Sequence, residues 1–233
     1  MSRRRFSKKN SPYNYIKYHS NLKDVVGDSH IFFFIHFHDV PNALFCLLII
    51  FKRTSENQMA KSDNIFLVGP MGVGKTTIGK KLARKLKKKF FDSDKEIEKK
   101  TGATINLIFD VEGEQGFRER ESKMIEELTS IDGIVMATGG GAVLSVSNRR
   151  VLSKRGTVIY LSGSPDLLMT RTAYDQNRPL LNTSDRLKKI KLLLKEREPL
   201  YSEVADMCLN VDNMTINGIV NSISTFLDER CEK

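Results

Sequence analysis

The stretch Ile65-Phe66-Leu67-Val68-Gly69-Pro70-Met71-Gly72-Val73-Gly74-Lys75-Thr76 decides the fold class of this 233-residue chain. Its first four residues are apolar and predict a buried strand, and residues 69–76 match the pattern GxxxxGK(S/T). Apolar residues then recur at helical spacing, at Ile78, Leu82, Ala83 and Leu86. A strand, this loop and a helix in succession are the context of a phosphate-binding loop, so the segment predicts binding of ATP or GTP.

The residue types in this loop suit a bound triphosphate. Glycines let successive backbone N–H groups turn towards phosphate oxygens, and the helix N-terminus adds the positive end of its dipole. We expect Lys75 to neutralise the β- and γ-phosphate oxygens and the Thr76 hydroxyl to ligate Mg²⁺. A glycine-rich turn that only caps a helix is the alternative.

Beyond this loop, short apolar runs alternate with amphipathic helices. Ser164 followed by Pro165 predicts a helix start, with a capping hydroxyl before a proline at the first helical position. Strands are expected at residues 65–68, 89–91, 134–138, 157–161 and 207–211, and a closing helix has its apolar face at Ile216, Ile219, Val220, Ile223, Phe226 and Leu227. This alternation predicts an α/β fold, with a five-stranded parallel sheet and helices on both faces.

Two carboxylates, Asp92 and Asp94, follow the second expected strand. Open α/β sheets bind their ligands at the carboxyl ends of the strands, so both side chains are placed to face the nucleotide. We expect Asp94 to orient and deprotonate an acceptor hydroxyl, and Asp92 to hold Mg²⁺ through water. The alternative is that one of them simply caps the helix that begins near Lys95.

The run Gly139-Gly140-Gly141 follows the third expected strand. Three glycines leave backbone amides exposed to a small ligand, although a flexible turn would have the same composition. Arg118 flanks the apolar face of a helix that includes Phe117, and a solvated surface charge is the alternative for it. Both interpretations stay open on the pattern alone.

Two further arginines stand near loops. Arg178 lies in a short polar segment suited to a lid that brings an arginine onto a transferring phosphoryl group. Arg197 precedes Pro199, which we expect to end a helix and leave Arg197 in its last turn. An intrahelical salt bridge to a neighbouring glutamate is the alternative for Arg197.

Six motifs occur in order between residues 60 and 230: IFLVGPMGVGKTTIG, FFDSDKEIEKKTG, IFDVEGEQGFRERE, IVMATGGGAVL, RPLL and EREPLY. Together they resemble the bacterial shikimate kinases. The resemblance implies a P-loop fold like that of the nucleoside monophosphate kinases, with core, substrate-binding and lid regions. It also implies transfer of the ATP γ-phosphate to the 3-hydroxyl of shikimate, in chorismate and aromatic amino acid biosynthesis. Another small-molecule kinase of this fold, acting on gluconate or a nucleotide, is the nearest alternative.

The same resemblance implies site residues. For shikimate they are Asp94, Arg118, Gly139, Gly140, Gly141 and Arg197. For the nucleotide they are Gly72, Val73, Gly74, Lys75, Thr76, Thr77, Arg171 and Arg178, and for Mg²⁺ Thr76 and Asp92. Catalytic roles fall to Lys75, Asp94 and Arg178.

Residues 1–58 differ from the rest of the chain and carry no helical or strand period. An apolar run at residues 31–51 is about long enough to span a bilayer, but His36, His38, Asp39 and Pro41 interrupt it, which argues against a membrane anchor. Met59 opens a second segment that runs directly into the first strand. We therefore expect residues 1–58 to be a disordered or dispensable extension, and residues 59–233 to be the kinase domain.

The formal net charge is +10, which could indicate nucleic acid, an anionic membrane or an acidic small substrate as partner. About half of the excess lies in residues 1–58, so the remainder is only mildly basic. We expect small-molecule substrates, with no nucleic acid or membrane as partner; a nucleotide-binding module with a basic N-terminal arm is the rival class. Three widely spaced cysteines predict thiols in a reducing cytoplasm, and a monomer is our default.

Overall fold

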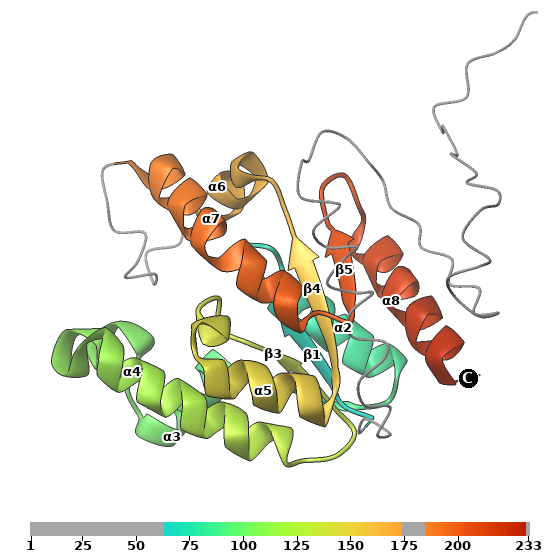
Figure 1. Cartoon of the computed structure of the whole chain (residues 1–233), viewed down its shortest axis with the longest axis horizontal. Helices are drawn as coiled ribbons and strands as arrows, with labels where there is room; N and C mark the ends of the chain where they lie inside the picture. Colours follow the sequence, from blue (N-terminus) through green and yellow to red (C-terminus); the bar gives the residue numbers. More distant parts are fainter. Residues whose placement is uncertain (1–62, 174–184, 232–233) are drawn as a thin grey trace, which may run out of the picture. The chain divides into compact units, whose positions relative to one another are not determined.

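Five strands form one parallel sheet in the order β2-β3-β1-β4-β5 (Figure 1). The computed structural model describes residues 63–173 and 185–231. The strands are β1 (Ile65–Val68), β2 (Lys89–Asp92), β3 (Ile134–Ala137), β4 (Thr157–Ser162) and β5 (Met207–Asn210). All five predicted strands are confirmed, with ends that differ by at most one residue from those expected. The predicted fold class is therefore confirmed as well.

Helices cover both faces of this sheet, as their apolar periods predicted. They are α2 (Lys75–Lys85), α3 (Ser93–Thr101), α4 (Ile105–Thr129), α5 (Val146–Arg155), α6 (Pro165–Thr172), α7 (Arg186–Val204) and α8 (Ile216–Cys231), with a 3₁₀ turn, η1, at Ala142–Leu144. Strand β1 shows why both faces need cover: Phe66 and Val68 lie in the core with α4 and α5, whereas Ile65 and Leu67 lie in the core with α2 and α8. Successive strand residues point to opposite faces, so a strand buried on both sides is apolar throughout.

Helix α7 runs beside α6 and then beside α5 (Figure 1), and it contributes Ile190 to the core on one face of the sheet and Tyr201 to the core on the other. The prediction that Pro199 ends this helix was wrong, because α7 continues to Val204. A proline cannot donate a hydrogen bond inside a helix, but Tyr201 and Val204 beyond it are buried in the core. Their burial offsets the missing bond, and tertiary packing overrides the local signal.

The N-termini of α6 and α8 were also the subject of predictions. Ser164 caps α6 as expected: its hydroxyl accepts a hydrogen bond from the N–H of Leu167, and Pro165 opens the helix. Ile216 was expected on the buried face of α8 but is 40% exposed, because it is the first residue of that helix and lies beyond the core contacts of Ile219 and Val220.

In the part of the chain that the structure describes, no helix is both long and apolar enough to cross a membrane. Residues 1–58 lie outside that part.

Candidate active site

Three loops meet at the carboxyl edge of the sheet because of the strand order. Strand β3 lies between β2 and β1, and its last residue, Ala137, is in register with Asp92 of β2 and with Leu67 of β1. The glycine turn after β3 therefore lies between the carboxylates after β2 and the phosphate-binding loop after β1. The Thr138 N–H and hydroxyl both bond to the Leu67 carbonyl, which fixes the start of the turn against β1.

The loop after β1 has the backbone that its sequence predicted. Gly74 caps α2 with a φ of 104°, a backbone conformation that residues with a Cβ rarely adopt. The Lys75 ammonium is buried and donates hydrogen bonds to the carbonyls of Gly69 (2.7 Å) and Pro70 (2.8 Å). Arg171 of α6 donates to the Val73 carbonyl at 3.0 Å, so this residue lies against the loop as well. Thr77 is exposed on the first turn of α2.

Thr76 and Asp92 meet across the gap between α2 and β2. The Thr76 hydroxyl lies 2.6 Å from Oδ2 of Asp92, while Oδ1 of Asp92 accepts a hydrogen bond from the Lys95 N–H at 3.4 Å. Asp92 is thus a helix cap and a partner of Thr76 at the same time, and the two interpretations of Asp92 are compatible. A hydroxyl and a carboxylate are hard oxygen donors that suit Mg²⁺, which commonly takes only one or two carboxylates besides phosphates and water. The residues present therefore fit this ion. Among the described residues, no group of three or more His, Cys, Asp and Glu side chains forms a protein-only metal site.

Two carboxylates face the first glycine of the turn. A Cβ placed on Gly139 would lie 2.7 Å from Oδ1 of Asp94 and 2.5 Å from Oε1 of Glu121. The Gly139 N–H donates to the Ser93 hydroxyl at 3.0 Å, which links the turn to the start of α3. Asp94, in the first turn of α3, therefore lies beside the glycine turn as a catalytic carboxylate would need to.

Arg118 approaches the same turn from α4. Its guanidinium lies where a Cβ on Gly141 would be, and it forms ion pairs with Glu121 (2.7 Å) and Glu114 (2.9 Å). The Arg118 side chain is only 19% exposed, so the alternative of a solvated surface charge does not describe it. Burial raises the pKa of Glu121, and the paired Arg118 guanidinium acts in the opposite direction.

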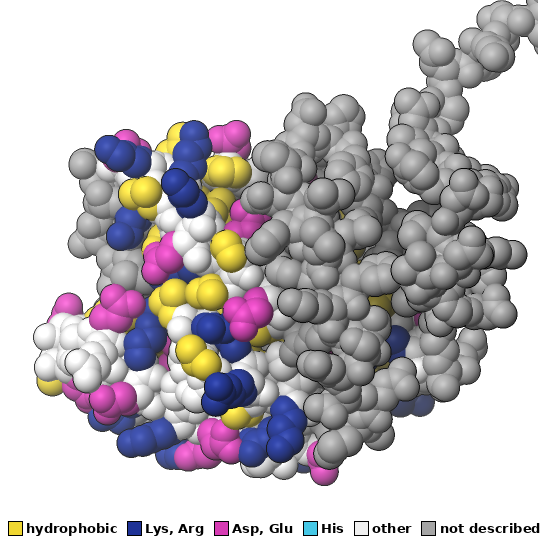
Figure 2. All heavy atoms as spheres, viewed as in Figure 1, with side chains coloured by type: hydrophobic (Ala, Val, Ile, Leu, Met, Phe, Trp, Pro, Cys, Tyr) yellow, Lys and Arg dark blue, Asp and Glu magenta, His cyan; other side chains and the backbone are white. Residues whose placement is uncertain are grey.

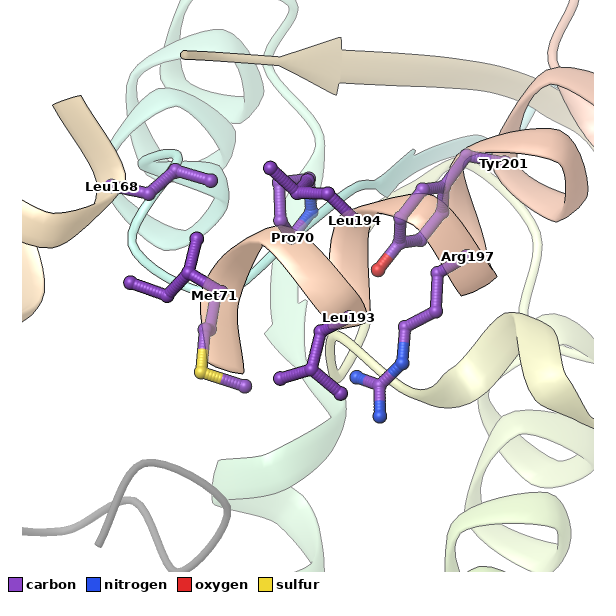
Figure 3. Close-up of a pocket in the computed structure, with 8 residues that line it drawn as sticks. Pro70, Met71, Leu168, Leu193, Leu194, Arg197 and Tyr201 are labelled. Carbon is purple, nitrogen blue, oxygen red and sulfur yellow. The ribbon is translucent and has the colours of Figure 1, made fainter. Parts of the chain in front are cut away.

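Arg197 reaches the turn from α7. It is 4% exposed, and its Nη1 donates to the Gly140 carbonyl at 3.4 Å. The described residues contain no ion pair of Arg197, so the predicted alternative of an intrahelical salt bridge is not found there. Figure 3 shows Arg197 and Tyr201 extending from α7 at a small pocket that Pro70 and Met71 of the phosphate-binding loop also line. The structure thus places Asp94, Arg118 and Arg197 around the glycine turn, and Lys75, Thr76, Asp92 and Arg171 at or beside the phosphate-binding loop. Thr77 is exposed and makes none of these contacts, and Arg178 lies outside the described residues.

Three polar residues of this site were not predicted from the sequence: Ser93, Glu121 and Tyr201. Glu121 is only 1% exposed, and its position within the apolar helical period of Phe117, Met124 and Ile125 was a signal for a buried charge. Ser93 and Tyr201 had no comparable signal, because their contacts join elements far apart in the sequence.

Substitution of Gly139 by alanine tests how tightly this turn is packed. The new methyl group would displace the carboxylates of Asp94 and Glu121, and we expect kcat/KM for the acceptor to fall by about 10-fold, as small misplacements of reacting groups allow. Gly218→Ala, whose methyl would meet nothing closer than 3.3 Å, is the control. If steady-state kinetics gave the same kcat/KM for Gly139→Ala as for the unchanged protein, the turn would not contact the reacting groups.

A phosphate-binding loop next to a carboxylate, one buried arginine and one partly buried arginine, on a five-stranded parallel sheet, defines the class of P-loop kinases. The comparisons with known proteins are specific within that class. The family described as "Shikimate kinase" matches residues 71–228, and this chain belongs to that family. It is similar to the shikimate kinase of Nitrosococcus oceani, with 56% identity over 160 residues (69% of this chain and 84% of that protein). It is similar to that of Legionella pneumophila strain Corby, with 50% identity over 169 residues (72% and 97%).

A solved structure agrees with this assignment. The shikimate kinase of Acinetobacter baumannii in complex with shikimate superposes with a TM-score of 0.72 at 46% sequence identity. The match covers 75% of this chain and 97% of that one. The family and the fold predicted from the six motifs are therefore confirmed.

Proposed function

We propose that this protein transfers the γ-phosphate of ATP to the 3-hydroxyl of shikimate and yields shikimate 3-phosphate, in chorismate and aromatic amino acid biosynthesis. The observation that carries the proposal is the convergence of Asp94, Arg118 and Arg197 on one glycine turn beside the phosphate-binding loop. Arginine offers a carboxylate two parallel hydrogen bonds, so the pair of Arg118 and Arg197 suits the acid group of an acceptor, while Asp94 suits its alcohol.

Each residue of the site has a separate role in this reaction. Arg118 and Arg197 hold the acceptor carboxylate, and Asp94 orients the acceptor hydroxyl and takes its proton. Lys75 and the backbone amides of residues 72–77 hold the phosphates, with Arg171 beside the nucleotide. We keep Arg178 as the lid arginine that reaches the transferring phosphoryl group. Catalysis is then mainly positioning and charge stabilisation, as is usual for phosphoryl transfer.

Thr76 and Asp92 are the residues that would hold Mg²⁺, Asp92 through water. When bound, the ion neutralises charge on the β- and γ-phosphate oxygens. The Thr76 hydroxyl oxygen and Oδ2 of Asp92 lie 2.6 Å apart, and this proximity supports the assignment because one ion could be held near both oxygens.

The remaining proposals concern partners and location. We propose a cytoplasmic monomer whose partners are ATP and shikimate, without nucleic acid or membrane, and in which residues 1–58 are dispensable. On the face seen in Figure 2, basic and acidic side chains of the described residues are interspersed, which supports small-molecule partners over a polyanion. Binding of DNA that weakens with salt would contradict this proposal.

Acceptor screening tests the function. The full chain, with ATP and Mg²⁺, is expected to release ADP rapidly in the presence of shikimate but not of gluconate or nucleoside monophosphates. Turnover with gluconate or a nucleotide and none with shikimate would overturn the proposal. Residues 59–233 assayed in parallel test the extension: equal turnover supports its dispensability, and turnover by the full chain alone contradicts it.

A further inference from the structure

The carbonyl of Gly140 is held from α7 by two side chains. The hydroxyl of Tyr201 donates a hydrogen bond to it, and Nη1 of Arg197 donates a second at 3.4 Å. Because α7 continues through Pro199, Tyr201 lies one helical turn after Arg197, and both side chains reach the same oxygen. Arg197 has a role in the proposed reaction, whereas Tyr201 has none so far.

The position of the Tyr201 ring is fixed independently of this bond. The ring is 1% exposed and stacks on Tyr160 of β4, with centroids 5.0 Å apart and an interplanar angle of 22°. A tyrosine hydroxyl is protonated at physiological pH, and burial raises the pKa of Tyr201 further in the same direction. A rigid, protonated donor anchored to the sheet is suited to fixing a flexible turn.

Fixing the Gly140 carbonyl also fixes the amide on the other side of the same peptide group. The peptide is planar and trans, so the Gly141 N–H points opposite to the Gly140 carbonyl. In the described part of the chain, neither the Gly140 N–H nor the Gly141 N–H donates to another protein group. Three consecutive glycines would otherwise sample many conformations, and the Tyr201 bond restricts them where Asp94 and Arg118 converge.

We propose that Tyr201 is a positioning residue for the acceptor: by holding the Gly140 carbonyl, its hydroxyl orients the backbone amides of Gly140 and Gly141 towards shikimate. This inference rests on the proposed function and adds to it a residue that touches neither substrate. The Tyr201 hydroxyl acts through the backbone, and the ring acts only as its support.

Tyr201→Phe tests the inference because it removes the hydroxyl and keeps the ring. Shikimate is titrated calorimetrically into the full chain without nucleotide, and kcat and both KM values are measured separately. We expect the Kd and KM for shikimate to rise by about 10-fold, the order expected when a buried carbonyl loses a hydrogen bond, with kcat and the KM for ATP nearly unchanged. A merely structural loss would instead lower kcat and the calorimetric stoichiometry through inactive molecules, and leave Kd and KM as they were; that pattern would overturn the inference.

Tyr160→Phe is the matched control, because it removes a hydroxyl from the other ring of the same stacked pair. We expect its Kd for shikimate to equal that of the unchanged protein. If both variants weakened binding equally, loss of either hydroxyl from this pair, and not the bond to Gly140 in particular, would be responsible, and the inference would be wrong. If the unchanged protein failed to bind shikimate, the proposed function would fall and the inference with it, whereas an unchanged Kd in Tyr201→Phe overturns the inference alone.

Discussion

Replacement of Asp94 by asparagine is expected to lower kcat with shikimate by roughly 10²- to 10⁴-fold, the usual range for loss of a general base. Asparagine keeps the size of the side chain and its ability to accept a hydrogen bond, but it cannot take up the hydroxyl proton. The KM for ATP should change little, because the nucleotide is held by the loop after β1. Steady-state kinetics with each substrate varied in turn measure both effects.

Glu96→Gln is the matched control for Asp94→Asn. Glu96 also contributes a carboxylate to the first turn of α3, but it pairs with Lys99 at 3.7 Å along the helix surface. It should leave kcat unchanged. If Asp94→Asn also left kcat unchanged, Asp94 would only place a favourable negative charge at the helix N-terminus and would take no part in the reaction.

Replacement of Arg118 by alanine is expected to raise the KM for shikimate by roughly 10- to 100-fold, since hydrogen bonds to charged groups are stronger than neutral ones. The variant should also be less stable by about 3 kcal/mol, because Glu121 is 1% exposed and would lose the partner of a buried ion pair. Without the guanidinium, the pKa of Glu121 rises further, since burial is then opposed less. Acceptor kinetics and urea unfolding measure the two effects.

Arg120→Ala is the matched control for Arg118→Ala, because Arg120 lies on the surface of the same helix. Arg120 pairs with Glu112 at 2.6 Å but is 43% exposed, so its loss should affect stability far less and leave the acceptor KM unchanged. Arg118→Lys adds a second comparison, since lysine keeps the charge but lacks the two-armed geometry that reaches Glu114 and Glu121 together. A rise in the KM for ATP alone would show that Arg118 serves the nucleotide and that our division of the site is wrong.

Much of the architecture could be predicted from local patterns. The apolar run at residues 65–68, the spacing of the glycines before Lys75 and the helical period after it predicted β1, the loop and the helix that follows it, α2. Patterns of this kind are read from neighbours a few positions apart, and the backbone obeys them because both strand and helix place side chains at fixed periods. The prediction at Pro199 failed for the converse reason: the local rule for proline was sound, but buried residues beyond it supply stabilisation that no local rule contains.

The sequence by itself determined the class of fold, the phosphate-binding loop and, through six ordered motifs, the shikimate kinase family. Only the tertiary structure decided that Asp94, Arg118, Glu121 and Arg197 surround one glycine turn, and that Tyr201 holds its carbonyl. These residues come from α3, α4 and α7, and the strand order β2-β3-β1 brings their helices to the turn that follows β3. Contacts between elements depend on how buried faces pack, and this information is spread over the whole core instead of lying in any one segment.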